Sequence, residues 1–148
     1  MKVEIQIDGQ LTAPRVVIHA PKLTTELATL VEQIEGTKAE TFLLSAKKDE
    51  KSYVIEPDQI EIIRTEGGIT TIYNRKGQSF STARPLHELE NQLGRDFIRI
   101  SKSSIVHIRH VDHLSRYFNG TMYIVMKNGV NDTISRSFLA SFKKRLGL

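Results

Sequence analysis

The sequence predicts an α+β protein in two parts, a small module over residues 1–55 and a mainly antiparallel β domain over residues 56–148. Two patterns predict this class. Short apolar runs bounded by Gly, Pro and Asn recur along most of the chain, which is typical of antiparallel strands. Three other stretches repeat apolar residues at a spacing of three or four, which is typical of amphipathic helices.

The N-terminal module is predicted to be a β-β-α-β unit. Apolar residues alternate with Glu4 and Gln6 in the first strand, and the second strand lies between two prolines. The helix is expected to have Thr24 as its N-cap and Gly36 at its C-terminal end. The predicted elements are strands at 3–7 and 15–19, a helix at 27–34, and strands at 41–46 and 53–55.

The second part is predicted to contain a hairpin, a short helix, further strands, a three-stranded meander and a closing helix. Gly94 ends the short helix, and Ser137 is expected to be the N-cap of the last one. The dipeptides at 119–120 and 128–129 are both Asn-Gly, which favours hairpin turns because both residues tolerate positive φ. The predicted strands lie at 60–63, 69–74, 78–82, 97–100, 105–108, 113–118, 121–126 and 130–134, and the helices at 84–94 and 138–146.

The positive charge is concentrated at the C-terminal end of the sequence. Residues 1–94 contain 11 Lys and Arg against 14 Asp and Glu, whereas residues 95–148 contain 10 against 3. Such asymmetry indicates an acidic partner, either nucleic acid or an anionic membrane surface, or else a solvated basic face. No apolar run is long enough to span a bilayer, and the N-terminus alternates polar and apolar residues, so we expect a cytoplasmic protein.

The sequence lacks the residues and motifs that are characteristic of most enzyme classes. The chain has no Cys, which excludes thiol nucleophiles, disulfides and iron–sulfur clusters. It also has no nucleophile elbow and no phosphate-binding loop, so we expect no catalytic residues, no cofactor and no small-molecule substrate. His107, His110 and His113 would line one face of a helix and could hold a metal, but their β-branched neighbours predict strands. On strands His107 and His110 point to opposite faces, so no metal site is expected.

The basic residues of the last third lie on strand ends and turns, so a recognition helix is not predicted and loops must make any contact with nucleic acid. Lys102 lies in a Ser-rich loop whose hydroxyl and backbone groups suit phosphate. Arg136 lies between two serines just before the last helix, where its guanidinium could bond guanine O6 and N7. The plain alternative for each is a solvated surface charge.

A set of landmarks occurs in order over residues 56–148. They are the turn at Glu66-Gly67, the hairpin glycine Gly77, the helix residues Leu86, Leu89, Glu90 and Leu93, the segment containing Phe97, Arg99, Ile100, Lys102, Ser103, Ile105 and Val106, and Ile134-Ser135-Arg136 ahead of Phe142, Lys143 and Leu146. This set resembles the LytTR DNA-binding domain family. The resemblance implies a bacterial transcriptional regulator whose loops enter successive major grooves of double-stranded DNA and bend it.

The resemblance also implies particular contact residues. The loop with Gly68 and Ile69, the loop at Lys102, and Arg136 correspond to the base-contact sites of the family. Ile69 has no hydrogen-bonding group, but it could touch a thymine methyl. The residues expected to position the DNA backbone are Arg99, Ser101, Ser103, Arg109 and Arg116.

The first 55 residues are too few for the phosphoacceptor receiver domain of the best-known relatives, and only Asp8 could stand for its acidic cluster. We expect this module either to form a homodimer that binds two half-sites or to receive a regulatory protein, which in some short relatives is membrane-bound. The main alternative is a protein-interaction module with weak or no specific DNA binding. Ile69 favours this alternative because its side chain cannot form a hydrogen bond with a base. RNA binding is disfavoured because the sequence has no aromatic platform on which bases could stack. An enzyme is disfavoured because the sequence has no recognisable set of acid–base or nucleophilic residues.

Overall fold

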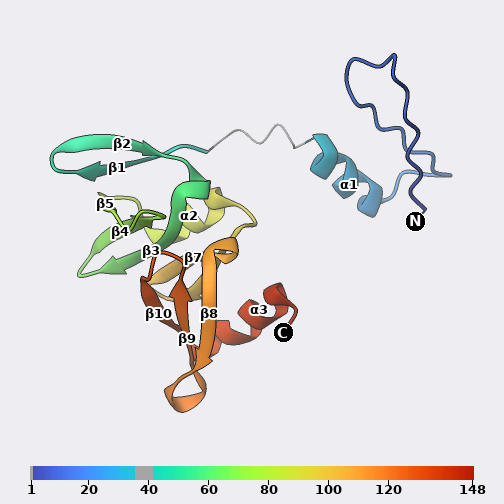
Figure 1. The fold of residues 1–148 in the computed structure, drawn as a ribbon. Coiled ribbons are helices and arrows are strands. Elements are labelled where there is room, and N and C mark those ends of the chain that lie inside the picture. The colour runs from blue at the N-terminus through green and yellow to red at the C-terminus, as the bar shows by residue number, and fades with distance from the viewer. Residues whose placement is uncertain (1, 36–41) are drawn as a thin grey trace. The chain divides into compact units, whose positions relative to one another are not determined.

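The computed structural model describes residues 2–35 and 42–148 (Figure 1). The chain divides into two compact units, residues 1–38 and 39–148. Gly36 and Thr41, which were predicted to end a helix and to begin a strand, lie outside the described residues.

Within residues 2–35 the first unit contains one helix, α1 (Thr25–Glu35), and residues 2–24 form neither helix nor strand. The helix and its N-cap are confirmed, because the Leu27 N–H donates to Thr24 Oγ1 at 3.2 Å. The strands predicted at 3–7 and 15–19 are wrong. A strand needs a neighbour for its backbone groups, and in these segments the apolar side chains, such as those of Val3 and Ile7, are largely exposed.

Over its described residues, 42–148, the second unit contains two antiparallel sheets and two α-helices. The larger sheet has the order β2-β1-β5-β4-β3-β7-β6, and the smaller has the order β10-β9-β8. The strands of the large sheet are β1 (Leu44–Lys48), β2 (Lys51–Ile55), β3 (Ile60–Glu66), β4 (Ile69–Asn74), β5 (Ser79–Thr82), β6 (Phe97–Ser101) and β7 (Ser104–His107). The remaining elements are β8 (Val111–Arg116), β9 (Met122–Met126), β10 (Asn131–Ile134), α2 (Leu86–Leu93) and α3 (Arg136–Leu146), with 3-10 turns η1 (Pro57–Gln59), η2 (Ile108–His110) and η3 (Phe118–Gly120). The α+β class and the three-stranded meander are confirmed.

The β1–β2 hairpin belongs to this second unit. Its strands were predicted to complete the N-terminal module, but β1 pairs with β5 at Lys47 and Ser81 and so extends the large sheet. The structure therefore divides the chain between residues 38 and 39 instead of at residue 55. Alternation within β1 explains the placement, because Leu44 and Ala46 are buried in the core of the large sheet while Ser45 faces outward.

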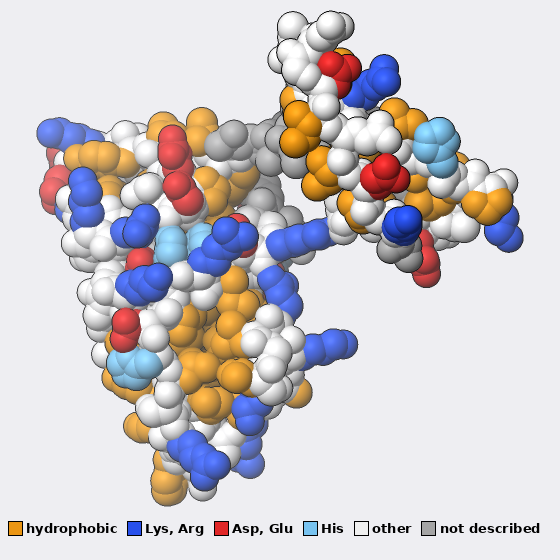
Figure 2. Space-filling model, turned by 45° about the vertical axis from the view of Figure 1, so that its right-hand side comes forward, with side chains coloured by type: hydrophobic (Ala, Val, Ile, Leu, Met, Phe, Trp, Pro, Cys, Tyr) orange, Lys and Arg blue, Asp and Glu red, His pale blue; other side chains and the backbone are white. Residues whose placement is uncertain are grey.

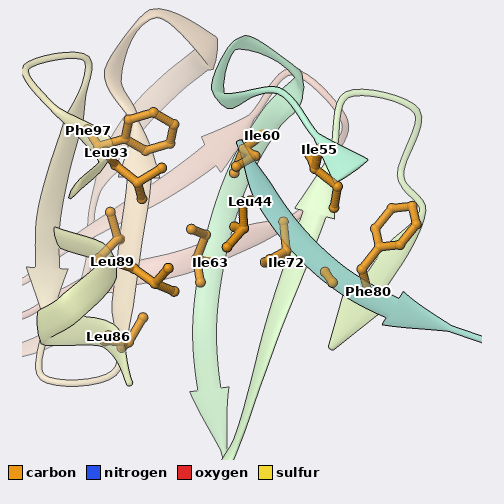
Figure 3. Close-up of a cluster of buried hydrophobic side chains, with 12 residues drawn as sticks. Leu44, Ile55, Ile60, Ile63, Ile72, Phe80, Leu86, Leu89, Leu93 and Phe97 are labelled. Carbon is orange, nitrogen blue, oxygen red and sulfur yellow. The ribbon is translucent and has the colours of Figure 1, made fainter. Parts of the chain in front are cut away.

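Two hydrophobic clusters lie on opposite faces of the β3–β7 pair. Ile63 and Ile105 belong to the first cluster, while their neighbours Ile62 and Val106 belong to the second. Because side chains alternate along a strand, these two central strands are buried on both faces. Figure 3 shows the first cluster, in which side chains from α2, the β1–β2 hairpin and β3 to β5 converge. The second cluster is closed by the smaller sheet and by Phe142 of α3, which is fully buried.

Two histidines stack inside this framework. The η2 turn brings His107 and His110 together with ring centroids 3.8 Å apart and planes 8° apart, so the prediction that they face opposite sides is wrong. His107 Nδ1 accepts from the Arg109 N–H at 3.3 Å, which requires an unprotonated nitrogen. Burial, together with the neighbouring His110, lowers the pKa of His107 to about 4. His113 is exposed and bonds Asp112 instead.

This burial predicts a pH dependence of stability. The unfolded chain binds a proton at His107 near pH 6.5, whereas the folded chain does so only near pH 4. The neutral ring therefore stabilises the fold fully above pH 6.5, and this contribution is lost as the pH falls toward 4. We expect His107→Gln to reduce the fall in unfolding free energy over that range by up to about 3 kcal/mol, measured by urea denaturation. The exposed residue His87 provides the control His87→Gln. An unchanged pH profile in His107→Gln would contradict the assignment.

Candidate nucleic-acid interface

The β3–β4 turn is a tight two-residue hairpin. Glu66 pairs with Ile69, and the two residues between them, Gly67 and Gly68, have φ of 56° and 79°. Positive φ at both positions is what a type I′ turn requires and what glycine allows without strain. The turn leaves Ile69 58% exposed, and Gly68 is exposed beside it.

The β6–β7 turn lies directly beside the first one. Ser101 pairs with Ser104, which leaves Lys102 and Ser103 at the tip. The Thr65 N–H donates to Ser103 O at 2.8 Å and so joins this turn to the end of β3. The Ser103 N–H donates to Ser101 Oγ at 3.2 Å. The Lys102 side chain is exposed, and none of the described residues forms an ion pair with it.

Arg99 supports the β6–β7 turn from below. Its Nε donates to Ser101 O at 2.7 Å, a second nitrogen donates to Lys102 O, and a third forms an ion pair with Glu90 at 2.9 Å. The side chain is only 17% exposed. Sequence reasoning placed Arg99 on the DNA backbone, but the geometry directs its donors inward and makes it a positioning residue for the Lys102 turn.

Arg64 is a central residue that the sequence did not single out. Its guanidinium donates to Asn131 O at 3.1 Å, lies 3.2 Å from the Glu66 carboxylate, and covers the Tyr73 ring at 4.9 Å. Burial opposes its charge, but Tyr73, Glu66 and Asp132 together raise the pKa of Arg64. The Ser104 hydroxyl donates to the same Asp132 at 2.6 Å. Arg64 thus joins the β3–β4 hairpin to β10, a contact that no local pattern could reveal.

Arg136 is the first residue of α3. The helix was expected to begin after it with Ser137 as N-cap, but the N-cap is Ser135, whose N–H donates to Ile100 O at 2.9 Å. This bond fixes the start of α3 beside the end of β6. A Cβ on Gly120 would lie 3.6 Å from Arg136 Cδ, so the aliphatic part of the arginine side chain lies beside the β8–β9 turn. Within the described chain no carboxylate pairs with Arg136.

The remaining two arginines lie at opposite ends of β8. Arg116 ends the strand next to the β8–β9 turn, so it lies at the same end of the small sheet as Arg136. Arg109 precedes the strand in η2 and forms an ion pair with Asp96 at 3.1 Å. At about 3.4 Å per residue the strand separates them by roughly 20 Å. The structure therefore groups Arg116 with the other candidate residues and leaves Arg109 apart.

Three segments thus form one continuous rim, which we call the turn rim: the β3–β4 turn (66–69), the β6–β7 turn (101–104) and the β10–α3 junction (134–136). Two backbone hydrogen bonds join them, Thr65 N–H to Ser103 O and Ser135 N–H to Ile100 O. Lys102 and Arg136 extend from it as unpaired cations of the described chain. Figure 2 shows Lys and Arg side chains distributed along one face of the second unit. The rim therefore presents polar and cationic groups on a rigid support.

The role of Arg99 predicts a local effect. Arg99→Ala removes three interactions under the β6–β7 turn, so we expect faster hydrogen exchange at the N–H groups of Thr65 and Ser103 and a loss of about 1–2 kcal/mol of stability. Hydrogen-exchange mass spectrometry and urea denaturation measure the two effects. Arg75→Ala, in the exposed β4–β5 turn, is the matched control. Exchange equal to that of the unmodified protein would show that the turn holds its shape without Arg99.

No helix in the described chain is both long and apolar enough to cross a bilayer. Among residues 2–35 and 42–148, no three metal-ligating side chains come together.

Comparison with known proteins gives a consistent result. A family model described as the LytTr DNA-binding domain matches residues 50–147. The sensory transduction protein LytR of Staphylococcus haemolyticus is 33% identical over 129 residues, which cover 85% of this chain and 50% of that protein. The transcriptional regulatory protein LytR of Staphylococcus aureus N315 is 34% identical over 106 residues, 71% of this chain and 43% of that protein. The chain spans about half the length of these curated relatives.

A solved structure supports the fold. A LytTr DNA-binding domain from Bacillus cereus superposes with a TM-score of 0.67 at 22% identity, covering 72% of this chain and 97% of that one. At this identity the likeness establishes a shared architecture.

Proposed function

This chain belongs to the LytTr DNA-binding domain family, and we propose that it is a sequence-specific regulator of transcription that binds double-stranded DNA, and not an enzyme. The turn rim carries the proposal. It sets two cations without carboxylate partners in the described chain, Lys102 and Arg136, on adjacent turns that backbone hydrogen bonds hold in place. Rigid support of this kind lets the tips enter a groove without ordering a loop at binding.

Each member of the rim has a proposed role. Arg136 donates two hydrogen bonds to guanine O6 and N7, Lys102 donates to a second base edge, and Ile69 touches a thymine methyl. The absence of a Cβ at Gly68 lets the backbone approach the duplex closely. The remaining contacts are to phosphates, and they come from Arg116 and from the hydroxyl groups of Ser101 and Ser103. Arg109, at the far end of β8, contributes only to the general attraction of the basic surface.

The N-terminal unit is proposed to assemble two copies of the chain on two half-sites. Residues 2–24 expose several apolar side chains outside any sheet, which favours a further partner for this segment. A membrane-bound regulatory protein is the other candidate for that surface. No cofactor enters the proposal, and the site of action is the cytoplasm.

Binding assays on selected DNA test the first claim. Selection from random duplexes should enrich one motif, and Arg136→Ala should weaken binding to it by about 1–3 kcal/mol and relax one base position. Lys102→Ala should relax a different position. Affinity should fall steeply with salt in the unmodified protein, as counterion release requires. Arg75→Ala serves as control, because the β4–β5 turn lies at the other end of β4 from the turn rim. Enrichment of no motif would instead favour the protein-interaction module.

Assembly is tested separately. Replacing Val3 and Ile5 together by Ser removes exposed apolar groups without touching either core, so the second unit should keep its stability. We expect the variant to sediment as a monomer and to lose affinity for paired half-sites while keeping its affinity for one half-site. The exposed residue Leu148 provides a control, Leu148→Ser. A variant that still forms dimers would exclude this segment as the assembly surface.

A further inference from the structure

The tip of the β8–β9 hairpin exposes two aromatic side chains. Tyr117 is 57% exposed and Phe118 is 75% exposed. We call residues 117–120 the aromatic turn. Phe118 belongs to neither hydrophobic cluster, so the folding of this unit does not explain its presence. Exposed aromatic groups of this size are more typical of binding surfaces than of the general protein surface.

The aromatic turn is held in one conformation. The Tyr117 N–H donates to Thr121 O at 3.1 Å, and the Thr121 hydroxyl donates to Phe118 O at 2.6 Å. Asn119 and Gly120 have φ of 55° and 72°, as the Asn-Gly pair predicted. The Tyr117 ring lies 5.8 Å from the Tyr123 ring. Phe118 is therefore presented outward on a fixed support, and little conformational entropy would be lost when it makes a contact.

The surroundings of the aromatic turn are basic. Arg136 passes Gly120, and Arg116 precedes Tyr117 in the chain. Neither arginine forms an ion pair with a carboxylate among the described residues. In Figure 1 this turn is the lowest point of the second unit, and Figure 2 shows hydrophobic and basic side chains together at that tip.

A large apolar ring flanked by cations fits a polyanion that also carries apolar groups. Duplex DNA offers both, since thymine methyls and deoxyribose lie between the phosphates. We propose that Phe118 is a further DNA-contacting residue, which packs on apolar groups of the duplex next to the base that Arg136 reads. This inference rests on the proposed function and adds a fourth segment to the three of the turn rim.

The test is Phe118→Ala in the full chain, measured on a duplex with one half-site so that assembly does not contribute. We expect about tenfold weaker binding with an unchanged salt slope, because an apolar contact releases no counterions. Arg116→Ala should instead lower the slope by about one. Val54 is an exposed apolar residue on β2, and the control variant Val54→Ala should bind like the unmodified protein.

Deoxyuridine in place of each thymine of the half-site identifies the partner group. At one position, loss of the thymine methyl should weaken DNA binding by the unmodified protein but leave binding by Phe118→Ala unchanged. If no position shows this difference between the two proteins, the ring packs on deoxyribose. Binding by Phe118→Ala within twofold of the unmodified protein, or an altered salt slope, overturns the inference. A shift to monomer with unchanged half-site affinity also overturns it, because the ring would then be an assembly contact. If the unmodified protein itself selects no duplex, the proposed function fails first.

Discussion

The pairing of β3 with β7 is the interaction on which the rest of the second unit depends. These strands are buried on both faces, so each contributes neighbouring side chains to different hydrophobic clusters. The first cluster holds α2 and the β1–β2 hairpin, and the second holds the small sheet and α3. Because β3 ends at one turn of the rim and β7 begins at the next, the register of this pair also sets the relative height of the two turns.

Polar interactions complete what the hydrophobic clusters begin. Arg64 joins the first hairpin to β10, and Arg99 joins β6 to α2 through Glu90. Both guanidiniums use their donors inside the protein, and both end beneath a turn of the rim. The rim is therefore rigid at its base, while Lys102 and Arg136 above it have no ion pair in the described chain. This division between supporting and presented cations could be read only from the three-dimensional structure.

Local sequence patterns were enough for most of this unit. Turns that contain glycine, together with alternating apolar residues, correctly predicted the β4–β5 hairpin and the meander, because turn chemistry and strand periodicity are local properties. The same alternation misled at residues 3–7 and 15–19, where no strand among the described residues pairs with the segment to satisfy its backbone. Arg64 and Arg99 show the other limit. Their partners are fixed by sheet topology, so a charge count alone cannot separate them from surface arginines.

The double burial of β3 has a consequence for how such proteins diversify. A one-residue insertion in β3 would exchange Ile62 and Ile63 between the two clusters and disturb both at once. Insertions of an odd number of residues in β3 are therefore strongly disfavoured in this architecture. Residues at the turn tips, such as Ile69 and Lys102, belong to neither hydrophobic cluster. New recognition properties should accordingly arise by exchange of tip side chains on an unchanged scaffold, so that related regulators would share their strand lengths while differing at a few exposed positions.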